Sequence, residues 1–330
     1  MKKLLLVLAA AFAMVACQTD INEVGVVADG VAAVEFEVGA PQMRSYSDGM
    51  TATVLQYAVY DAQGEELDQL RNESVELVNG KANVKIELAN NKRYSVIFWA
   101  EAENAPYTFN FADQTVTVDY TNAACNDEAR DAFYAYKEFE VKGAATISVE
   151  LRRPFAQVNV GTSDLTAAQN SGFNPSTSAL VVKNVFSTLN LVDGTASDNV
   201  EEVAFTTADV PTGETFPVDD STYTYMAMSY VLVGKDKGSY DVTYTITAAD
   251  GTVINNTVGA VPMQANYRTN IYGKLLTSIT DINVEIKPGY NEPANDVEYK
   301  VVGSAQDLQQ AIEDLNNSTP GSEGESVTSS

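Results

Sequence analysis

The chain has 330 residues, 45% of them hydrophobic, which is enough to bury two cores of ordinary size. Its 45 acidic and 20 basic residues leave a formal charge of −25, which disfavours nucleic acid as a partner because phosphate backbones are repelled. The sequence has no histidine, which excludes a Ser-His-Asp triad, a Cys-His pair and a histidine-ligated zinc ion. Catalysis by a pair of carboxylates, as in glycoside hydrolysis, remains possible. With 45 acidic residues some pairs will be close by chance, so proximity alone is weak evidence of an active site. We therefore expect no enzyme, no catalytic residue, no cofactor and no metal site.

The first 16 residues have the pattern of an export signal. Lys2 and Lys3 precede an apolar run, 4–13, that is too short to span a bilayer as a resident helix. The run ends in Met14-Val15-Ala16-Cys17, which resembles a lipobox, although methionine stands where leucine is usual. We predict a lipoprotein signal peptide over 1–16, cleavage between Ala16 and Cys17, and acyl chains on Cys17 that hold the protein in a membrane. The alternative is an ordinary secretory leader followed by an incidental cysteine.

Residues 17–30 are predicted to form a polar tether, and 31–151 an N-terminal β-domain. Val31–Val38 alternates apolar and acidic residues, as a strand with one buried face does. A turn-rich loop follows, in which Arg44 is a candidate site for a trypsin-like protease that would leave Ser45 as a new N-terminus; the alternative is a solvated loop arginine. Further strands are predicted at 54–60, 75–78, 82–88, 93–100, 107–111, 114–120, 139–141 and 144–151, and a helix at 126–136.

Three local features of this first domain carry specific expectations. Asn79-Gly80 predicts a two-residue hairpin turn, because both residues accept positive φ. Trp99, the single tryptophan, lies in an apolar run and is expected in the core. Cys125 is left without a partner once Cys17 is lipidated, and we expect a small buried thiol.

Pro154 marks the change from one domain to the next. Alternating runs lie on both sides of it, and proline removes a ladder donor, so it is expected where the chain leaves one sheet and enters another. The second β-domain is predicted over 152–288, with strands at 180–185, 187–192, 200–205, 223–233, 239–248, 252–258, 265–276 and 281–286. Asp250-Gly251 predicts another hairpin turn. Many short strands with little helix indicate antiparallel sandwiches.

The chain changes character after Pro288. Residues 289–315 are predicted to form a linker and a strand-helix extension, with the strand at 297–302 and a helix that begins at Ser304 or Ala305. Residues 316–330 are rich in Ser, Gly and Glu and are predicted to be a disordered tail. The acidic stretch 193–198 lacks the pattern of a calcium loop and is expected to be a solvated turn.

Five segments together resemble a known family. In chain order they are RSYSDGMTATVLQYAVYDAQGEEL (44–67), YSVIFWA, NDEARDAFYAY, LRRPFAQVNVGTSDL and NYRTNIYGKLLT. This combination resembles the fimbrillin-like lipoproteins of Bacteroidetes, relatives of type V pilus subunits, anchors and tips. The resemblance implies an all-β protein of two tandem transthyretin-like antiparallel β-sandwich domains with one short helix, displayed on the outer membrane. It also implies strand exchange, in which cleavage at Arg44 releases Val31–Val38 and a strand of another pilus subunit takes its place.

Two functions from different classes follow from the sequence. The first is a cell-surface lipoprotein with a structural or adhesive role, a fimbrial component anchored through Cys17 and assembled by strand exchange. The second is a non-polymerising surface lipoprotein that binds a glycan or protein ligand on a host or bacterial surface. Asp220-Ser221-Thr222 additionally resembles an O-glycosylation sequon of exported proteins, which makes Ser221 a candidate modification site.

Overall fold

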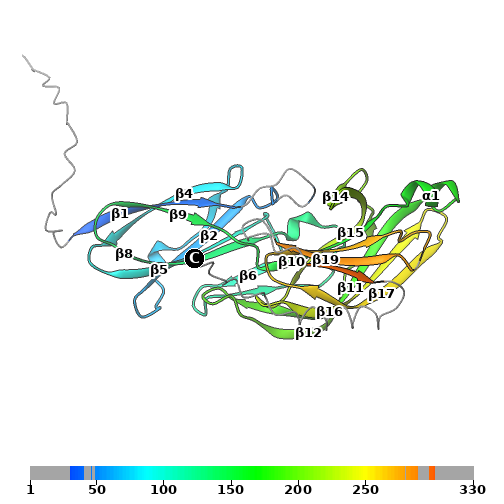
Figure 1. Cartoon of the computed structure of the whole chain (residues 1–330). Helices are drawn as coiled ribbons and strands as arrows, with labels where there is room; N and C mark the ends of the chain where they lie inside the picture. The colour runs from blue at the N-terminus through cyan, green and yellow to red at the C-terminus, as the bar shows by residue number, and fades with distance from the viewer. Residues whose placement is uncertain (1–29, 41–45, 47–48, 279, 289–296, 302–330) are drawn as a thin grey trace, which may run out of the picture.

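The computed structural model describes residues 30–40, 46, 49–278, 280–288 and 297–301. In these residues the protein is all-β with one short α-helix, α1 (Leu165–Asn170), and two 3₁₀ helices, η1 (Asp68–Leu70) and η2 (Glu128–Arg130). The strands form four sheets. Figure 1 shows them as two lobes placed end to end, blue to green in the first lobe and mostly green to orange in the second.

The first lobe is a sandwich of a three-stranded sheet, ordered β4-β1-β9, and a four-stranded sheet, ordered β3-β2-β5-β8. Their bounds are β1 (Val31–Gly39), β2 (Val54–Asp61), β3 (Asn72–Glu76), β4 (Lys81–Ala89), β5 (Arg93–Glu101), β8 (Phe133–Glu140) and β9 (Ala145–Glu150). Alternation along β4 turns Val84, Ile86 and Leu88 inward and leaves Lys85 and Glu87, which lie between them, exposed. The inward residues of both sheets form one buried core.

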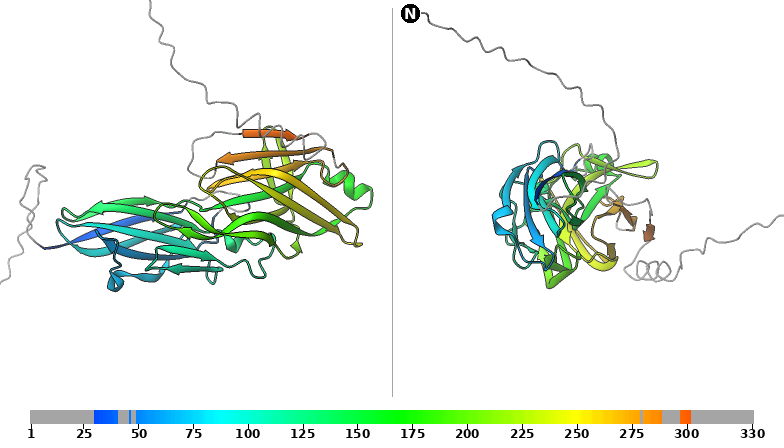
Figure 2. Two further views of the ribbon diagram at one scale, coloured as in Figure 1. Left: turned by 90° about the horizontal axis from the view of Figure 1, so that it is seen from below. Right: turned by 90° about the vertical axis from the view of Figure 1, so that its left-hand side faces the viewer.

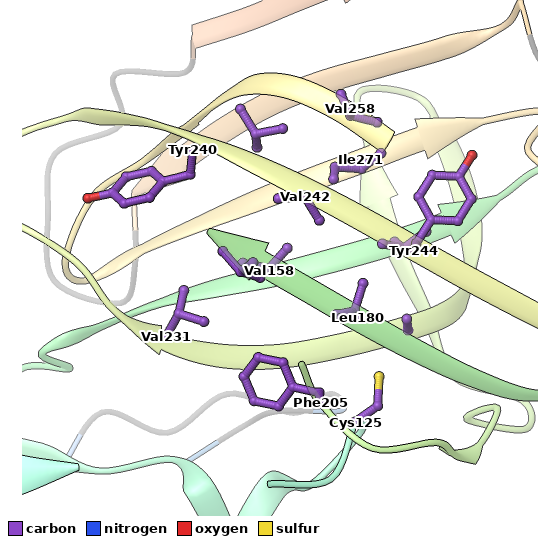
Figure 3. Close-up of a cluster of buried hydrophobic side chains, with 14 of the residues drawn as sticks. Cys125, Val158, Leu180, Phe205, Val231, Tyr240, Val242, Tyr244, Val258 and Ile271 are labelled. Atoms are coloured by element: carbon purple, nitrogen blue, oxygen red, sulfur yellow. The ribbon is translucent and has the colours of Figure 1, made fainter. Parts of the chain in front are cut away.

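The second lobe packs a six-stranded sheet, ordered β14-β15-β10-β18-β19-β20, against a seven-stranded one whose main path is β17-β16-β11-β7-β6. Two further strands, β12 and β13, pair with β11. The bounds are β6 (Tyr107–Asn110), β7 (Thr115–Val118), β10 (Phe155–Thr162), β11 (Pro175–Asn190), β12 (Ala196–Ala204), β13 (Ala208–Asp209), β14 (Thr215–Val218), β15 (Ser221–Leu232), β16 (Gly238–Ala248), β17 (Val253–Met263), β18 (Tyr267–Gly273), β19 (Ile282–Pro288) and β20 (Val297–Val301). Figure 3 shows the core between these sheets, where Val158, Leu180, Val242 and Ile271 converge.

A third buried cluster joins the two lobes. The face of β2 and β5 that points away from the first core carries Tyr60, Ile97 and Trp99, all with no exposed surface. These side chains share a cluster with Met228 and Tyr230 of β15. The hairpin of β6 and β7 also connects the lobes. In the sequence it lies between β5 and β8 of the first lobe, and it pairs with β11 in the second lobe. The lobes are therefore connected by packing as well as by the chain (Figure 2).

Several predictions from the sequence are confirmed. Asn79 and Gly80 have φ values of 51° and 68° and close a turn in which Val78 and Lys81 bond reciprocally. The two flanking strands then separate, because β3 pairs with β2 and β4 pairs with β1. Asp250-Gly251 connects β16 and β17 as a hairpin. Pro154 lies between β9, which ends in the three-stranded sheet, and β10, which begins in the six-stranded sheet.

The helix predicted at 126–136 is wrong. Asp127 does cap a turn, since its carboxylate accepts from the N–H of Ala129, but the turn is the single 3₁₀ turn η2. From Phe133 the chain is strand β8, because it pairs with β5 and aromatic residues favour strands. Phe133 is buried, and Tyr134, Tyr136 and Phe139 are partly buried. The one α-helix of the described chain is α1, which the sequence analysis did not predict.

Two boundaries in the second half also differ from the prediction. The strands expected at 180–185 and 187–192 are a single strand, β11, whose irregularity is Asn184 with φ 59°. The strand expected at 297–302 is β20, which pairs with β19 at the margin of the six-stranded sheet, as Figure 2 shows in orange-red. The predicted helix after Ser304 and the tail 316–330 lie outside the described residues. The division into domains at residues 151 and 152 stays a prediction.

Candidate functional site

Strand β1 is the feature that bears most directly on assembly. It is the first described strand of the chain, yet it lies in the middle of its sheet. On one side it pairs antiparallel with β4, from Val31 opposite Ala89 to Gly39 opposite Lys81. On the other side it pairs in parallel with β9. Both edges of its main chain are thus hydrogen-bonded, and removing it would leave two unpaired edges at once.

The inner face of β1 fills the core of the first lobe. Val34, Phe36 and Val38 have at most 2% of their surface exposed. The ring of Phe36 lies edge-on to Phe98 at 5.5 Å and to Phe139 at 5.3 Å, measured between ring centroids. This strand therefore occupies an apolar groove whose other walls come from the rest of the lobe.

The outer face of β1 is charged and solvated. Glu35 lies opposite Lys85 in the register with β4, and Glu37 accepts a hydrogen bond from the hydroxyl of Ser148 on β9. Beside Glu37 a shallow cleft of about 710 Å³ opens over the three strands. Contacts of this exposed kind contribute little to stability, so the inner face dominates the retention of β1.

The chain after β1 leads towards the junction of the lobes. The main chain of Ala40 donates to Gly80, and the next described residue is Tyr46. Its ring packs against Tyr225 at 5.0 Å, and its hydroxyl donates to the carbonyl of Asn126 at 3.2 Å. Arg44 and Ser45, the candidate protease site, lie outside the described residues, between β1 and this contact.

A buried ion pair lies where β9 passes into β10. The Nε and Nη2 atoms of Arg153 each donate to a carboxylate oxygen of Asp131 at 2.6 Å, and neither side chain is more than 1% exposed. Burial raises the pKa of Asp131, and the guanidinium opposes that rise. The same guanidinium lies over the rings of Phe133 and Tyr230, so the pair links the two lobes.

A second buried acid lies on β5 beside the junction. The carboxylate of Glu101 accepts from the indole N–H of Trp99 and from the amide of Gln56, both at 2.7 Å. Burial raises the pKa of Glu101, and these two hydrogen bonds oppose the rise. The predicted core position of Trp99 is confirmed, while its polar partners went unnoticed in the sequence.

A row of buried polar side chains crosses the six-stranded sheet. Gln157 donates to Asn159 at 2.9 Å, Asn159 to Asn270 at 2.8 Å, and Asn270 to Glu285 at 2.6 Å. Lys287 ends the row with a 3.0 Å contact to Glu285. Each member is satisfied by the next, so the row is a structural network, and it fixes the register of β10, β18 and β19.

The other predicted residues are placed as follows. Ala16 and Cys17 lie outside the described residues, so the signal and the lipid anchor stay predictions. Ser221 is exposed at the start of β15, in a hairpin with Val218, where an enzyme can reach it. Cys125 is a buried free thiol, as expected, and burial raises its pKa. Asp193 closes a turn by accepting from the N–H of Thr195.

The described part of the chain has no helix with the length and hydropathy needed to cross a bilayer. It also contains no group of three or more Asp, Glu, Cys or His side chains arranged to hold a metal ion. A cleft of about 460 Å³ opens where β2, β5 and β8 meet the turn between β6 and β7, and it is lined in part by Arg93, Tyr136 and Glu138.

Comparison with known proteins finds one matching family model and several solved structures to which the chain is similar. The model of a family of unknown function, DUF6562, matches residues 29–316. The chain is similar to a fimbrial assembly protein from Parabacteroides distasonis, at 15% identity and a TM-score of 0.43, over 82% of this chain and 99% of that one. It is also similar to the fimbrial anchor protein Mfa2 from Porphyromonas gingivalis, at 14% identity and a TM-score of 0.41, over 82% of this chain and 100% of that one. The comparison with curated proteins finds no match. The expected resemblance to Bacteroidetes fimbrial proteins is thus found over most of the chain.

Proposed function

The chain belongs to the DUF6562 family, and we propose that it is a surface lipoprotein with a structural or adhesive role, a component of a type V pilus. In this proposal Cys17 carries the acyl chains that hold the uncut chain in the outer membrane. The two lobes are the transthyretin-like sandwiches that the sequence resemblance implies. Pilus subunits are its partners, and a ligand on a host or bacterial surface is its target.

The observation that carries the proposal is the placement of β1. An N-terminal strand inserted between β4 and β9 has a chain connection to the lobe only through its C-terminal end. Hydrolysis of the Arg44–Ser45 peptide bond would cut that connection and leave β1 held by hydrogen bonds and by its buried face. Its departure would open an apolar groove with two unpaired edges, which a strand from another subunit can satisfy.

The energetics allow such an exchange without allowing spontaneous loss. Burial of Val34, Phe36 and Val38 contributes about 1.5–3 kcal/mol for each side chain. A donor strand with three comparable apolar residues recovers the same contribution, so exchange is close to neutral while an empty groove is unfavourable. The uncut chain therefore keeps β1, and the cut chain exchanges it when a donor is present.

A second candidate function rests on the 460 Å³ cleft. Tyr136 offers a partly exposed ring, and Arg93, Glu138 and Gln114 offer donors and acceptors around it. Aromatic surface combined with planar polar groups suits a sugar ring. This favours a non-polymerising lipoprotein that binds glycan. A glycan array probed with the full chain, and with Tyr136→Ala as the comparison, would show binding that the variant loses; an array without hits contradicts it.

Strand exchange is tested with the purified chain and an arginine-specific protease. We expect a cut after Arg44 and, by native mass spectrometry, a fragment ending at Arg44 that stays bound to the remainder. Added synthetic peptide 31–39 should displace this fragment, and Arg44→Ala should abolish both the cut and the displacement. A fragment that leaves at once, or one that excess peptide never displaces, contradicts the proposal.

The anchor is tested separately by membrane fractionation. The wild-type chain should be found in the outer membrane, and Cys17→Ala should be released from it. A Cys17→Ala chain that remains fully bound to the membrane contradicts the lipid anchor and leaves the strand-exchange test untouched.

A further inference from the structure

Strand β17 is a long free edge of the seven-stranded sheet. It pairs with β16 on one side and with no other strand in the described part of the chain. Figure 1 labels it among the strands of the second lobe. Along its first half Val253, Asn255 and Thr257 are exposed, and Val253 has 54% of its surface exposed. The outer main-chain edge of residues 253–258 therefore has no strand partner in the described part of the chain.

The absence of charge distinguishes β17 from the other described sheet edges of five residues or more. It has 11 residues, none of them acidic or basic. The other described edges that are five residues or longer carry charged residues, among them Glu73, Glu76, Lys85, Glu87, Glu138, Glu140, Glu150, Glu201, Glu202, Glu298 and Lys300. The remaining edges, β6, β13 and β14, have four residues or fewer. Charge and short length are common protections against edge-to-edge pairing, and β17 has neither.

The structural protections of β17 are confined to its second half. Ala260 has φ 54° next to a register shift against β16, and Pro262 lacks an N–H. Val261, Pro262 and Met263 are buried. Residues 253–258 have no such bulge or proline.

The polar side chains of the first half are already bonded to β16. Asn255 donates to Thr245 at 2.7 Å, and the hydroxyls of Thr257 and Thr243 lie 2.8 Å apart. These cross-strand bonds hold the strand flat against its neighbour, so the outward feature of residues 253–258 is the unpaired main chain itself.

Two carboxylates of the β16–β17 hairpin accept hydrogen bonds within that hairpin. Asp250 accepts from the N–H of Thr252 at 2.9 Å, and Asp241 accepts from the N–H of Ala260 at 3.1 Å. Neither aspartate belongs to β17. A strand that pairs with residues 253–258 therefore meets no carboxylate of β17.

We propose that residues 253–258 pair antiparallel with the same residues of a second copy of this chain. The choice of a second copy follows from charge and symmetry. With a net charge of −25, two copies repel each other over most of their surfaces, and an uncharged edge lets them meet without carboxylates of the paired strands opposing one another. An antiparallel edge carries both donors and acceptors, so a two-fold axis satisfies both copies equally. This pairing uses the second lobe and is independent of strand exchange at β1.

Such a contact is small, so we expect a weak, concentration-dependent dimer. The test is sedimentation velocity on the full chain carrying Cys17→Ser, which removes acyl chains as a cause of association. Between about 2 µM and about 200 µM the average mass should rise towards twice that of one chain. Thr257→Lys, which places two ammonium groups at the pairing edge, should keep the mass at one chain over the whole range.

Thr146→Lys is the matched control, because it makes the same exposed substitution on edge strand β9 of the other lobe. It should dimerise as the parent chain does. Hydrogen exchange supplies the second readout, with slower exchange at residues 253–258 at the high concentration. A parent chain that is monomeric throughout, equal effects of the two lysines, or protection that appears elsewhere would each overturn the proposal.

Discussion

Phe36→Ala is the substitution that most directly probes how β1 is held. Phe36 is fully buried and contacts two further rings, so truncation removes a large apolar side chain and leaves a cavity in the first core. Substitutions of this kind cost about 3–5 kcal/mol. Because about 1.4 kcal/mol corresponds to a factor of ten, the β1 fragment of the cut chain should bind its lobe roughly 100- to 4,000-fold more weakly.

The assay measures dissociation of that fragment. The chain is cut after Arg44, the fragment carries a fluorophore near its N-terminus, and excess unlabelled peptide 31–39 prevents rebinding. Glu35→Ala is the control on the same strand, since Glu35 is exposed on the outer face and its loss should change the free energy by no more than about 0.5 kcal/mol. Equal dissociation rates for the two variants would refute the argument that the inner face retains β1.

Three further predictions concern stability, measured by thermal or urea unfolding. The pKa of Glu101 is raised in the folded state, so its contribution to stability is full below the unfolded pKa and is lost as pH rises through the folded pKa. Glu101→Gln should therefore be more stable than wild type at pH 7 and lose that advantage near pH 4. A stability difference that stays constant between these pH values would contradict this. Arg153→Met should cost about 3–5 kcal/mol by leaving Asp131 buried and unpaired, and adding Asp131→Leu should recover most of the loss; additive losses would argue against the pair. Gly273→Ala should destabilise by about 1–3 kcal/mol or more, because a Cβ there would lie 1.7 Å from a main-chain oxygen at φ 151°, and a wild-type midpoint would refute the close approach.

The sequence was informative where one local rule acts alone. Asn79-Gly80 has positive φ at both positions because few other residue pairs accept it, and Pro154 falls between two sheets because proline cannot donate to a ladder. The inward alternation of Val34, Phe36 and Val38 was likewise visible, and burial confirms it.

Prediction failed where tertiary contacts decide between local preferences. Asp127 does cap a turn at the start of residues 126–136. From Phe133, however, the chain pairs with β5, and this pairing prevails over the local preference for helix. The pairing of β6 and β7 with β11 joins residues about 70 positions apart, which periodicity cannot indicate. The contacts of Arg153 with Asp131 and of Glu101 with Trp99 depend on which faces the lobes turn towards each other, so only the structure reveals them.

The central claim is that β1 is a removable strand in a fimbrial protein that is anchored through Cys17 only until it is cut after Arg44. The measurement that tests it most directly is an SDS gel of surface fractions from native cells, run with and without boiling, with N-terminal sequencing of the main band. The account predicts a ladder that collapses on boiling and a mature chain that begins at Ser45. A single acylated band that begins at Cys17 and does not change on boiling would contradict it, and Arg44 would then be an uncut loop residue.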